Sequence, residues 1–456
     1  MSSTAVEVAG WRENRSNIRA ASAVMLSTAL VKACALLKEV VVAGAYGRSD
    51  ELEAFLIAAL IPGLLINLIA ESTNQALIPT LVRVREQKGK ERAGQLFSSV
   101  TGWSLLLLIA AAAAAAVGAR SIFTIVGSHF SSAKLELSIE LFYGMLPVVA
   151  ITGVASICTV VLNTEGVFAL PAVAPAITPL LTIVFVPLLA VRSGVWALVY
   201  AMVAAGMIHA SLMLWKAGAY GYRLFSRWCG WNQEIREVAG QFGLVALSSL
   251  VASGGLVVDQ AMAASLPAGS IAALVYAGRF VGVVLALLGA AVASVMTPRF
   301  SEMVAGAEWA RCGRMMRDWA WGSGGAAAAV SAALIACSSI LIRMTLQHGV
   351  FDMRDSRAVS GVLVMYALQI PFFVASRVFY RFLVAARRTE IVLYCGVVNL
   401  VLDVCLNLLL MRWLGVAGIA LATSIWAVST FVFLWYWSRR VLAELSCGNV
   451  DARAAG

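Results

Sequence analysis

Long apolar runs are the feature that most constrains the fold of this chain. The run from Leu105 to Ala119 contains no charged side chain, and similar runs recur along the whole sequence. A transmembrane barrel would instead show short segments of alternating polarity. Since a hydrocarbon core of about 30 Å requires a helix of about 20 apolar residues, the runs predict an all-α integral membrane protein with about 12 transmembrane helices. The expected spans are 20–46, 53–79, 96–119, 138–162, 168–191, 193–215, 238–264, 270–297, 320–342, 358–384, 390–411 and 414–438.

Composition supports a membrane location. Of the 456 residues, 61% are hydrophobic and 13% are charged, whereas soluble domains average about 45–50% apolar and about 25% charged residues. This difference excludes an ordinary soluble enzyme and a disordered chain. The eight cysteines show no paired spacing of the kind found in metal sites or redox motifs. We therefore expect no catalytic group, no cofactor and no metal site.

Positive charge is distributed unevenly between the two sides of the expected bundle. One side holds the N-terminus, the tail and the basic connections 80–95, 216–237 and 298–319, with more than twice the Lys and Arg residues of the other side. Cytoplasmic loops of membrane proteins collect Lys and Arg. We therefore expect both termini in the cytoplasm, and we interpret the net charge of +10 as loop charge and not as nucleic-acid binding. The N-terminus lacks the features of a signal peptide, so the first span is expected to remain in the membrane.

The chain also repeats itself at an offset of roughly 220 residues. Pro79 and Pro298 each end a span before a basic connection, and Thr164-Glu165 and Thr389-Glu390 each open one. Six spans per half give two parallel six-helix repeats, which in transporters surround a central cavity and rock about a site near the midplane. The expected organisation is 1–19 cytoplasmic N-terminus, 20–216 N-terminal lobe, 217–237 cytoplasmic linker, 238–438 C-terminal lobe and 439–456 cytoplasmic tail.

Charged residues within the spans are the candidate binding groups, because a charge at the bilayer centre costs about 2.5–3.5 kcal/mol unless it faces a cavity or a partner. Asn67 and Glu71 lie four residues apart and share one helix face. Arg279 lies too deep in its span to reach an interface easily. The candidates for substrate binding are Lys32, Lys38, Glu39, Asn67, Glu71 and Arg279.

A second group of polar residues suits either ion coupling or contacts between helices. Asn399, Asp403 and Asn407 are spaced four apart and form one polar stripe. Asp259 and Arg377 lie in other spans. Both interpretations remain open for these five residues, since polar side chains also join helices in membranes. In the fifth span, Pro171, Pro175 and Pro179 predict a broken or bent helix.

Several segments, taken in order, resemble one protein family. In the first half these are the run from Lys38 to Gly47, Pro62-Gly63-Leu64-Leu65, Ala70-Glu71 and the run from Gln75 to Pro79. In the second half they are Tyr276-Ala277-Gly278-Arg279, the run from Gln347 to Phe351 and residues 398–407. Together they resemble the MurJ/MviN family of the multidrug/oligosaccharidyl-lipid/polysaccharide (MOP) superfamily.

The resemblance implies a flippase and no enzyme. Its cargo would be an undecaprenyl-diphosphate-linked glycan precursor, either a lipid II-like peptidoglycan precursor or an exopolysaccharide repeat unit. Alternating access would carry it from the cytoplasmic to the outer leaflet of the bacterial inner membrane. The other expected partners are membrane lipids and glycan-assembly enzymes. The resemblance also implies that Lys32 and Lys38 are a basic pair with Glu39 as acidic partner, and it adds Glu53 to the substrate-binding residues.

The chain departs from the family pattern at several positions. The first span carries lysines where the family typically has arginines, and Ile66 and Asn67 replace an arginine pair. Gly278 replaces the acid before Arg279, and two C-terminal spans are absent. Because lysine does not bind phosphate through two parallel hydrogen bonds, these departures favour an exopolysaccharide unit slightly over lipid II.

Three other functions remain open. A drug or cation antiporter of the same superfamily would have a cavity dominated by acids, whereas the internal charges here nearly balance. A membrane glycosyltransferase would need clustered carboxylates or a histidine in a large outer loop. A membrane scaffold for glycan assembly would need no charge within its spans.

Overall fold

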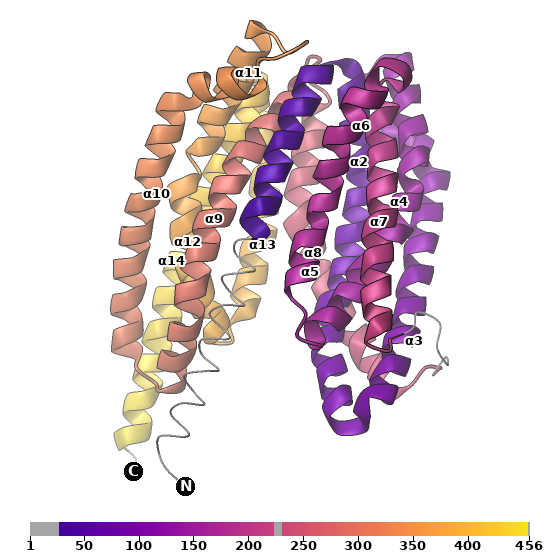
Figure 1. The fold of residues 1–456 in the computed structure, drawn as a ribbon. Coiled ribbons are helices and arrows are strands. Elements are labelled where there is room, and N and C mark those ends of the chain that lie inside the picture. Colours follow the sequence, from indigo (N-terminus) through magenta and orange to yellow (C-terminus); the bar gives the residue numbers. More distant parts are fainter. Residues whose placement is uncertain (1–26, 223–229, 455–456) are drawn as a thin grey trace. The chain divides into compact units, whose positions relative to one another are not determined.

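The computed structural model describes residues 27–222 and 230–454, which form helices and turns without any strand (Figure 1). Every expected span is mostly helical, the first of them from residue 27 onward, but the second and fifth change helix type and the tenth is interrupted by a turn at 368–369. The expected cytoplasmic N-terminus and part of the expected linker lie outside the described residues. After the helical segment 27–46, the elements are α2 (Asp50–Leu65), η1 (Ile66–Glu71), α3 (Ser72–Val126), α4 (Ser132–Thr164), α5 (Ala169–Val173), η2 (Ala174–Ala176), α6 (Ile177–Ser193), α7 (Trp196–Ala219), α8 (Gln233–Ala263), α9 (Ser270–Ala305), α10 (Trp309–Leu346), α11 (Met353–Ala367), α12 (Ile370–Ala385), α13 (Thr389–Leu414) and α14 (Val416–Ala454).

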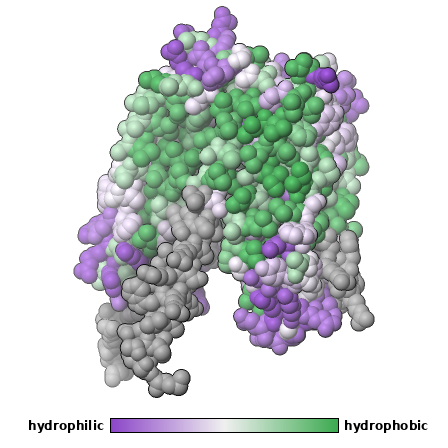
Figure 2. All heavy atoms as spheres, in the orientation of Figure 1, coloured by the Kyte–Doolittle hydropathy of each residue, from purple (hydrophilic) through white to green (hydrophobic). Residues whose placement is uncertain are grey.

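Length and composition make many of these helices candidate membrane spans. Ten helical segments of the described residues are long and apolar enough to cross a membrane, and one of them, Asp50–Val126, contains two expected spans. Figure 2 shows apolar side chains along the middle of the visible helices and hydrophilic side chains at their ends. The predicted class, an all-α membrane protein, is confirmed.

Helix α3 extends through a segment that we expected to be a loop. Residues 80–95 are helical on both sides of Gly89, which has φ 83° and ψ 173° and kinks the chain. Lys, Arg, Glu and Gln fill this segment and are good helix formers. Glycine adopts a positive φ without a steric penalty, so a single residue separates the two helical parts.

The prolines of the fifth span break its helix, as predicted. The span consists of α5, the 3₁₀ turn η2 and α6. Proline lacks the backbone N–H needed within a helix, and Pro175 lies inside the 3₁₀ turn.

The chain forms two compact units. Unit 1 comprises residues 1–46, 54–125 and 131–250, and unit 2 comprises 47–53, 126–130 and 251–456. The short segment 47–53 consists of a turn and the first four residues of α2. Although it lies early in the sequence, it therefore belongs to unit 2. Unit 1 has a core formed by α3, α4 and α7, in which Leu77, Phe97, Val161 and Met213 are almost completely buried.

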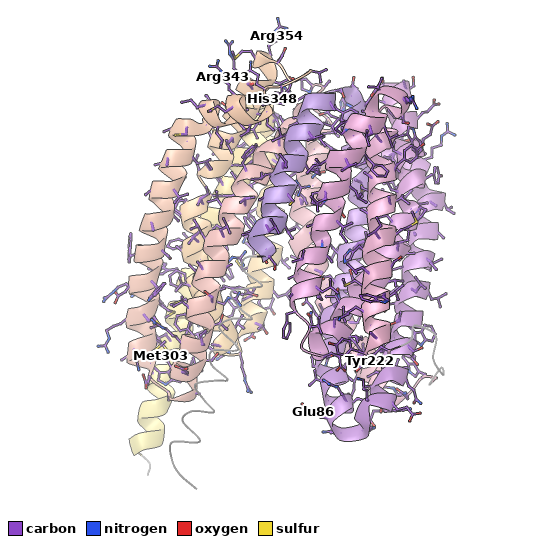
Figure 3. All side chains as sticks on the ribbon, viewed as in Figure 1. Glu86, Tyr222, Met303, Arg343, His348 and Arg354 are labelled. Carbon is purple, nitrogen blue, oxygen red and sulfur yellow. The ribbon has the colours of Figure 1, made fainter. Side chains whose placement is uncertain are left out.

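In unit 2, α9 and α12 pack side by side in the same direction. A Cβ atom on Gly289 would lie 3.7 Å from the Phe373 ring, and the rings of Phe300 and Phe382 are 5.8 Å apart. The later contact involves a higher residue number on both helices, so α9 and α12 run parallel to each other. Figure 3 shows Met303, near the end of α9, at one end of unit 2, and Arg343, His348 and Arg354 at the other end.

Candidate functional site

The first helical segment presents one paired and one unpaired lysine. Lys38 Nζ lies 2.8 Å from the Glu39 carboxylate, which is buried, so the charge of Lys38 is locally balanced. Lys32 is partly exposed and makes no ion pair or hydrogen bond with the described residues. Lys32 is therefore the better candidate for binding an anion.

An exposed polar stripe follows in the second span. Asn67 and Glu71 lie in the π-helical turn η1, and both are exposed, as is Gln75 one turn later. The opposite face packs inside unit 1, where the Ser72 hydroxyl donates to Ser249 on α8 at 3.2 Å. π-Turns often occur at functional sites. An exposed carboxylate in an apolar span requires water or a ligand beside it.

Glu53 caps the N-terminus of α9. Its side chain is only 1% exposed, and Oε1 accepts the backbone N–H groups of Ile271 at 2.7 Å and Ala272 at 3.3 Å. The residue before α9 is Gly269, which has no side chain to cap the helix. The first N–H groups of a helix need external acceptors and favour a negative charge, and Glu53 supplies both.

Three further contacts of unit 2 surround this cap. Arg48 donates to the Gly269 carbonyl at 2.8 Å and lies 3.4 Å from the Asp355 carboxylate. The Tyr276 hydroxyl donates to the Gly47 carbonyl at 3.0 Å. The segment 47–53 is thus held to the starts of α9 and α11. Sequence reasoning missed Arg48 and Asp355, because each is one of many charged loop residues and only the fold brings them together.

Arg279 lies two turns beyond the cap on α9 and is exposed. Tyr276 and Phe280, its neighbours on the helix, are buried. Arg279 therefore lies at the edge of the packed face of α9 with an exposed side chain.

A buried polar cluster joins α8, α13 and α14. Asn407 donates to Asp259 Oδ1 at 2.7 Å, and the Thr423 hydroxyl donates to Asp259 Oδ2 at 3.2 Å. Asp403 lies beside Gly255 of α8, where a Cβ atom would be 3.6 Å from its Oδ2 atom. Asp403 and Asn407 of the predicted α13 stripe thus face α8, which carries Asp259. Thr423 was missed, since nothing in its apolar surroundings marks it.

Several oxygens of this cluster lack partners within the described residues. They are the Oδ1 atoms of Asn399, Asp403 and Asn407, all buried. Asn399 otherwise donates to Thr430 at 2.8 Å. Buried polar atoms are normally hydrogen-bonded, and carboxylate, amide and hydroxyl oxygens are ligands for hard cations. The described residues contain no group of three His, Cys, Asp or Glu side chains that could hold a metal ion.

Arg377 is not part of that cluster. Its guanidinium stacks over the Phe373 ring at 4.2 Å and lies 5.7 Å from the Tyr380 ring. Arg381, one turn later, lies 5.5 Å from the same Tyr380 ring. Cation–π contacts of this kind stabilise a desolvated guanidinium but leave its charge unbalanced.

Ion pairs at the ends of the unit 1 helices form a further cluster that sequence reasoning missed. Glu234 is buried and accepts from Lys88 at 2.8 Å and Arg92 at 3.3 Å, on the two sides of the Gly89 kink. Glu165 accepts from Arg85 and from the Tyr222 hydroxyl, both at 3.0 Å. Burial and the bond to Glu165 raise the pKa of Tyr222 to about 12. The basic segment 80–95 is therefore fixed to α4 and α8.

Comparisons with known proteins agree on one family. The family model described as "Lipid II flippase MurJ" matches residues 42–451. A "Probable lipid II flippase MurJ" from Synechocystis is 24% identical over 458 residues, which cover 96% of this chain and 84% of the relative. The "Lipid II flippase MurJ" of Burkholderia cenocepacia is 25% identical over 358 residues, covering 75% of this chain and 68% of the relative.

Solved structures show the same fold. "Lipid II flippase MurJ, inward closed conformation" superposes with a TM-score of 0.80 at 21% identity, covering 94% of this chain and 90% of that chain. An inward-facing multidrug resistance MATE family transporter of the MOP superfamily gives 0.77 at 15% identity, covering 93% and 98%. At these identities the likeness concerns the fold alone.

Proposed function

The chain belongs to the MurJ lipid II flippase family, and on that premise we propose that it moves a lipid-linked peptidoglycan precursor across a bacterial cytoplasmic membrane. Members of this family are transporters, so the chain is a transporter and not an enzyme. The main support for the proposal is the match of the family model over residues 42–451. The direction is from the cytoplasmic to the outer leaflet, by alternating access.

The orientation rests on charge. Both termini are placed in the cytoplasm, because the basic connections, including 80–95 and 298–319, lie on their side. The outer side then holds the segment 47–53 and the starts of α9 and α11. Surrounding lipids and glycan-assembly enzymes are the other proposed partners.

Each unit offers an accessible basic side chain for the cargo diphosphate. Lys32 in unit 1 is partly exposed without an ionic partner among the described residues, and Arg279 in unit 2 is exposed on α9. Both are proposed to bind phosphate oxygens through charge-assisted hydrogen bonds. Lys38 and Glu39 balance each other and position the first helical segment.

The polar stripe and the cap have separate roles in this proposal. Asn67 and Glu71 contact the polar head group from unit 1, since both are exposed within an apolar span. Glu53 acts as a positioning residue, because its carboxylate fixes the start of α9 and thereby the place of Arg279.

The buried cluster of Asp259, Asp403, Asn407 and Thr423 is proposed to couple transport to a monovalent cation, sodium or a proton. Inward movement of a cation and outward movement of a diphosphate are both favoured by an interior-negative potential, by about 2.3 kcal/mol per charge per 100 mV. The unpartnered oxygens of Asp403 and Asn407 support this role over a purely interhelical one.

Native mass spectrometry of the gently purified protein tests the cargo. A retained polyprenyl diphosphate that carries a muropeptide is the expected result. The second candidate cargo is an exopolysaccharide repeat unit, because Asn67 stands where the family typically has an arginine. Retention of a different oligosaccharide on the same carrier would change the assignment to polysaccharide export. Retention of bulk phospholipid alone, even after undecaprenyl diphosphate is added, would contradict the proposal and favour the antiporter.

A further inference from the structure

Two arginines on α12 have no role in the function proposed so far. Arg377 and Arg381, the α12 arginine pair, lie one turn apart and share the ring of Tyr380, at 5.7 Å and 5.5 Å. Neither forms an ion pair with the described residues, and the Nε atom of Arg381 is buried without a partner there. Two guanidinium groups held close together within a membrane helix repel each other. An anion between or beside them would relieve this repulsion.

The register of unit 2 separates this pair from Arg279. Gly289 of α9 lies opposite Phe373 of α12, and the two helices run parallel. Arg377, four residues beyond Phe373, is therefore level with residue 293 of α9. At 1.5 Å per residue, it lies roughly 20 Å along the helix axis from Arg279. One diphosphate cannot contact both places at once, so an anion bound at the arginine pair would be separate from one bound at Arg279.

The direction of α12 places the pair toward the cytoplasm. α11 starts near Arg354, and α9 ends near Met303 at the opposite end of unit 2 (Figure 3). Arg381 lies four residues before the end of α12 at Ala385, and the basic residues Arg387 and Arg388 follow. In the orientation proposed above, Arg381 is thus nearest the cytoplasmic leaflet, Arg377 is deeper and Arg279 lies still farther from the cytoplasm.

We propose that the α12 arginine pair is a capture subsite for the diphosphate of a polyprenyl-linked cargo on the cytoplasmic side of unit 2. This inference rests on the proposed function and adds a first binding place to it. A diphosphate suits the pair because each guanidinium offers a planar fork of donors to phosphate oxygens. The guanidinium of Arg377 lies over the Phe373 ring and that of Arg381 lies over the Tyr380 ring, and neither ring carries a negative charge that would neutralise the pair.

An anionic phospholipid has the same phosphate chemistry, and the experiment separates the two sources. The full-length protein is placed in phosphatidylcholine nanodiscs, and its affinity for undecaprenyl diphosphate and for phosphatidylglycerol is measured by native mass spectrometry. The variants are the double change Arg377→Gln with Arg381→Gln, the double change to Lys, and Arg279→Gln. Arg412→Gln removes an exposed arginine from the last turn of α13 and is the matched control.

The Gln double variant should bind undecaprenyl diphosphate about tenfold or more weakly, because a lost charge-assisted hydrogen bond has roughly this effect. The Lys double variant should fall between it and the unchanged protein, and phosphatidylglycerol binding should stay the same. If the Gln double variant fails to fold, the Lys double variant is used for the test. It keeps both positive charges and loses only the planar set of guanidinium donors.

Three results would overturn the subsite. Unchanged diphosphate affinity in both double variants, with a loss in Arg279→Gln, would remove the subsite and leave the proposed function standing. A selective loss of phosphatidylglycerol would reassign the pair to lipid anchoring. Absence of diphosphate binding in the unchanged protein would contradict the proposed function itself, and the subsite with it.

Discussion

Glu53 Oε1 accepts the backbone N–H of Ile271 at 2.7 Å, which joins a carboxylate from the start of α2 to the first turn of α9. The two residues are 218 positions apart in the sequence. The contact explains why an acid occurs after the glycine turn at Gly47. It satisfies orphan helix donors that Gly269 cannot reach.

Glu53→Ala should lower the free energy of unfolding by about 0.5–2 kcal/mol, the usual cost of losing a helix cap. Glu53→Gln should lose less, because its amide oxygen still accepts the hydrogen bonds while the charge at the helix terminus is gone. Thermal melts of the purified protein measure both changes. Glu51→Ala, at an exposed position of the same helix, is the control, and an equal effect there would contradict the capping role.

The two lysines of the first helical segment should respond differently to substitution. Lys38→Ala removes a partner of the buried Glu39 carboxylate, so we expect a loss of about 1–3 kcal/mol in the free energy of unfolding. Lys32→Ala should leave stability unchanged and reduce transport. Changing Lys38 to Met together with Glu39 to Gln should recover part of the stability, as both charges are then removed. Equal stability of the two Ala variants would argue against this division of roles.

Cation binding at the Asp259 cluster should appear as stabilisation. If sodium binds, its addition at constant ionic strength should raise the free energy of unfolding by about 1.4 kcal/mol at ten times the dissociation constant. Asp259→Asn and Asp403→Asn should abolish the effect, and Asp318→Asn, which changes an exposed acid, should retain it.

Protons are the other cation that the cluster can take. In that case stability should depend on pH instead of sodium, and the same two variants should lose the dependence. A cluster that responds to neither sodium nor pH is a set of interhelical contacts only.

Glu234 should be the most sensitive acid of the unit 1 ion cluster. It is buried and contacts both Lys88 and Arg92. Glu234→Gln should destabilise the protein by about 1–3 kcal/mol, because two cations lose their charged partner. The exposed pair of Arg311 and Glu308 is the comparison, since surface pairs contribute about 0–1 kcal/mol. A similar loss in Glu308→Gln would show that burial does not decide the effect.

Apolar periodicity and composition were sufficient to predict an all-α membrane protein, because the membrane demands long unbroken spans. The stripe of Asn399, Asp403 and Asn407 was visible for the same reason, since polar residues four apart stand out within an apolar run. Its partner Thr423 was not visible, because a lone threonine is common in a helix.

Contacts between distant segments could not be predicted from local patterns. The Glu53 cap and the Arg48–Asp355 contact depend on loops that lie far apart in sequence. Residues 80–95 were expected to form a loop but are helical with a kink at Gly89. A basic segment rich in helix formers has the polar composition of a solvent-exposed segment whether it is a loop or a helix, so composition alone did not distinguish the two.

Translocation of lipid II in proteoliposomes tests the central claim most directly. The measurement is the rate at which lipid II becomes accessible in the opposite leaflet, for the unchanged protein, for Lys32→Ala and Arg279→Ala, and for Arg412→Ala as control. We predict flipping by the unchanged protein and the control, and a rate about tenfold or more lower in each of the other two variants, which lose charge-assisted contacts with the diphosphate. Failure of the unchanged protein to move lipid II, or full rates in both variants, would contradict the account.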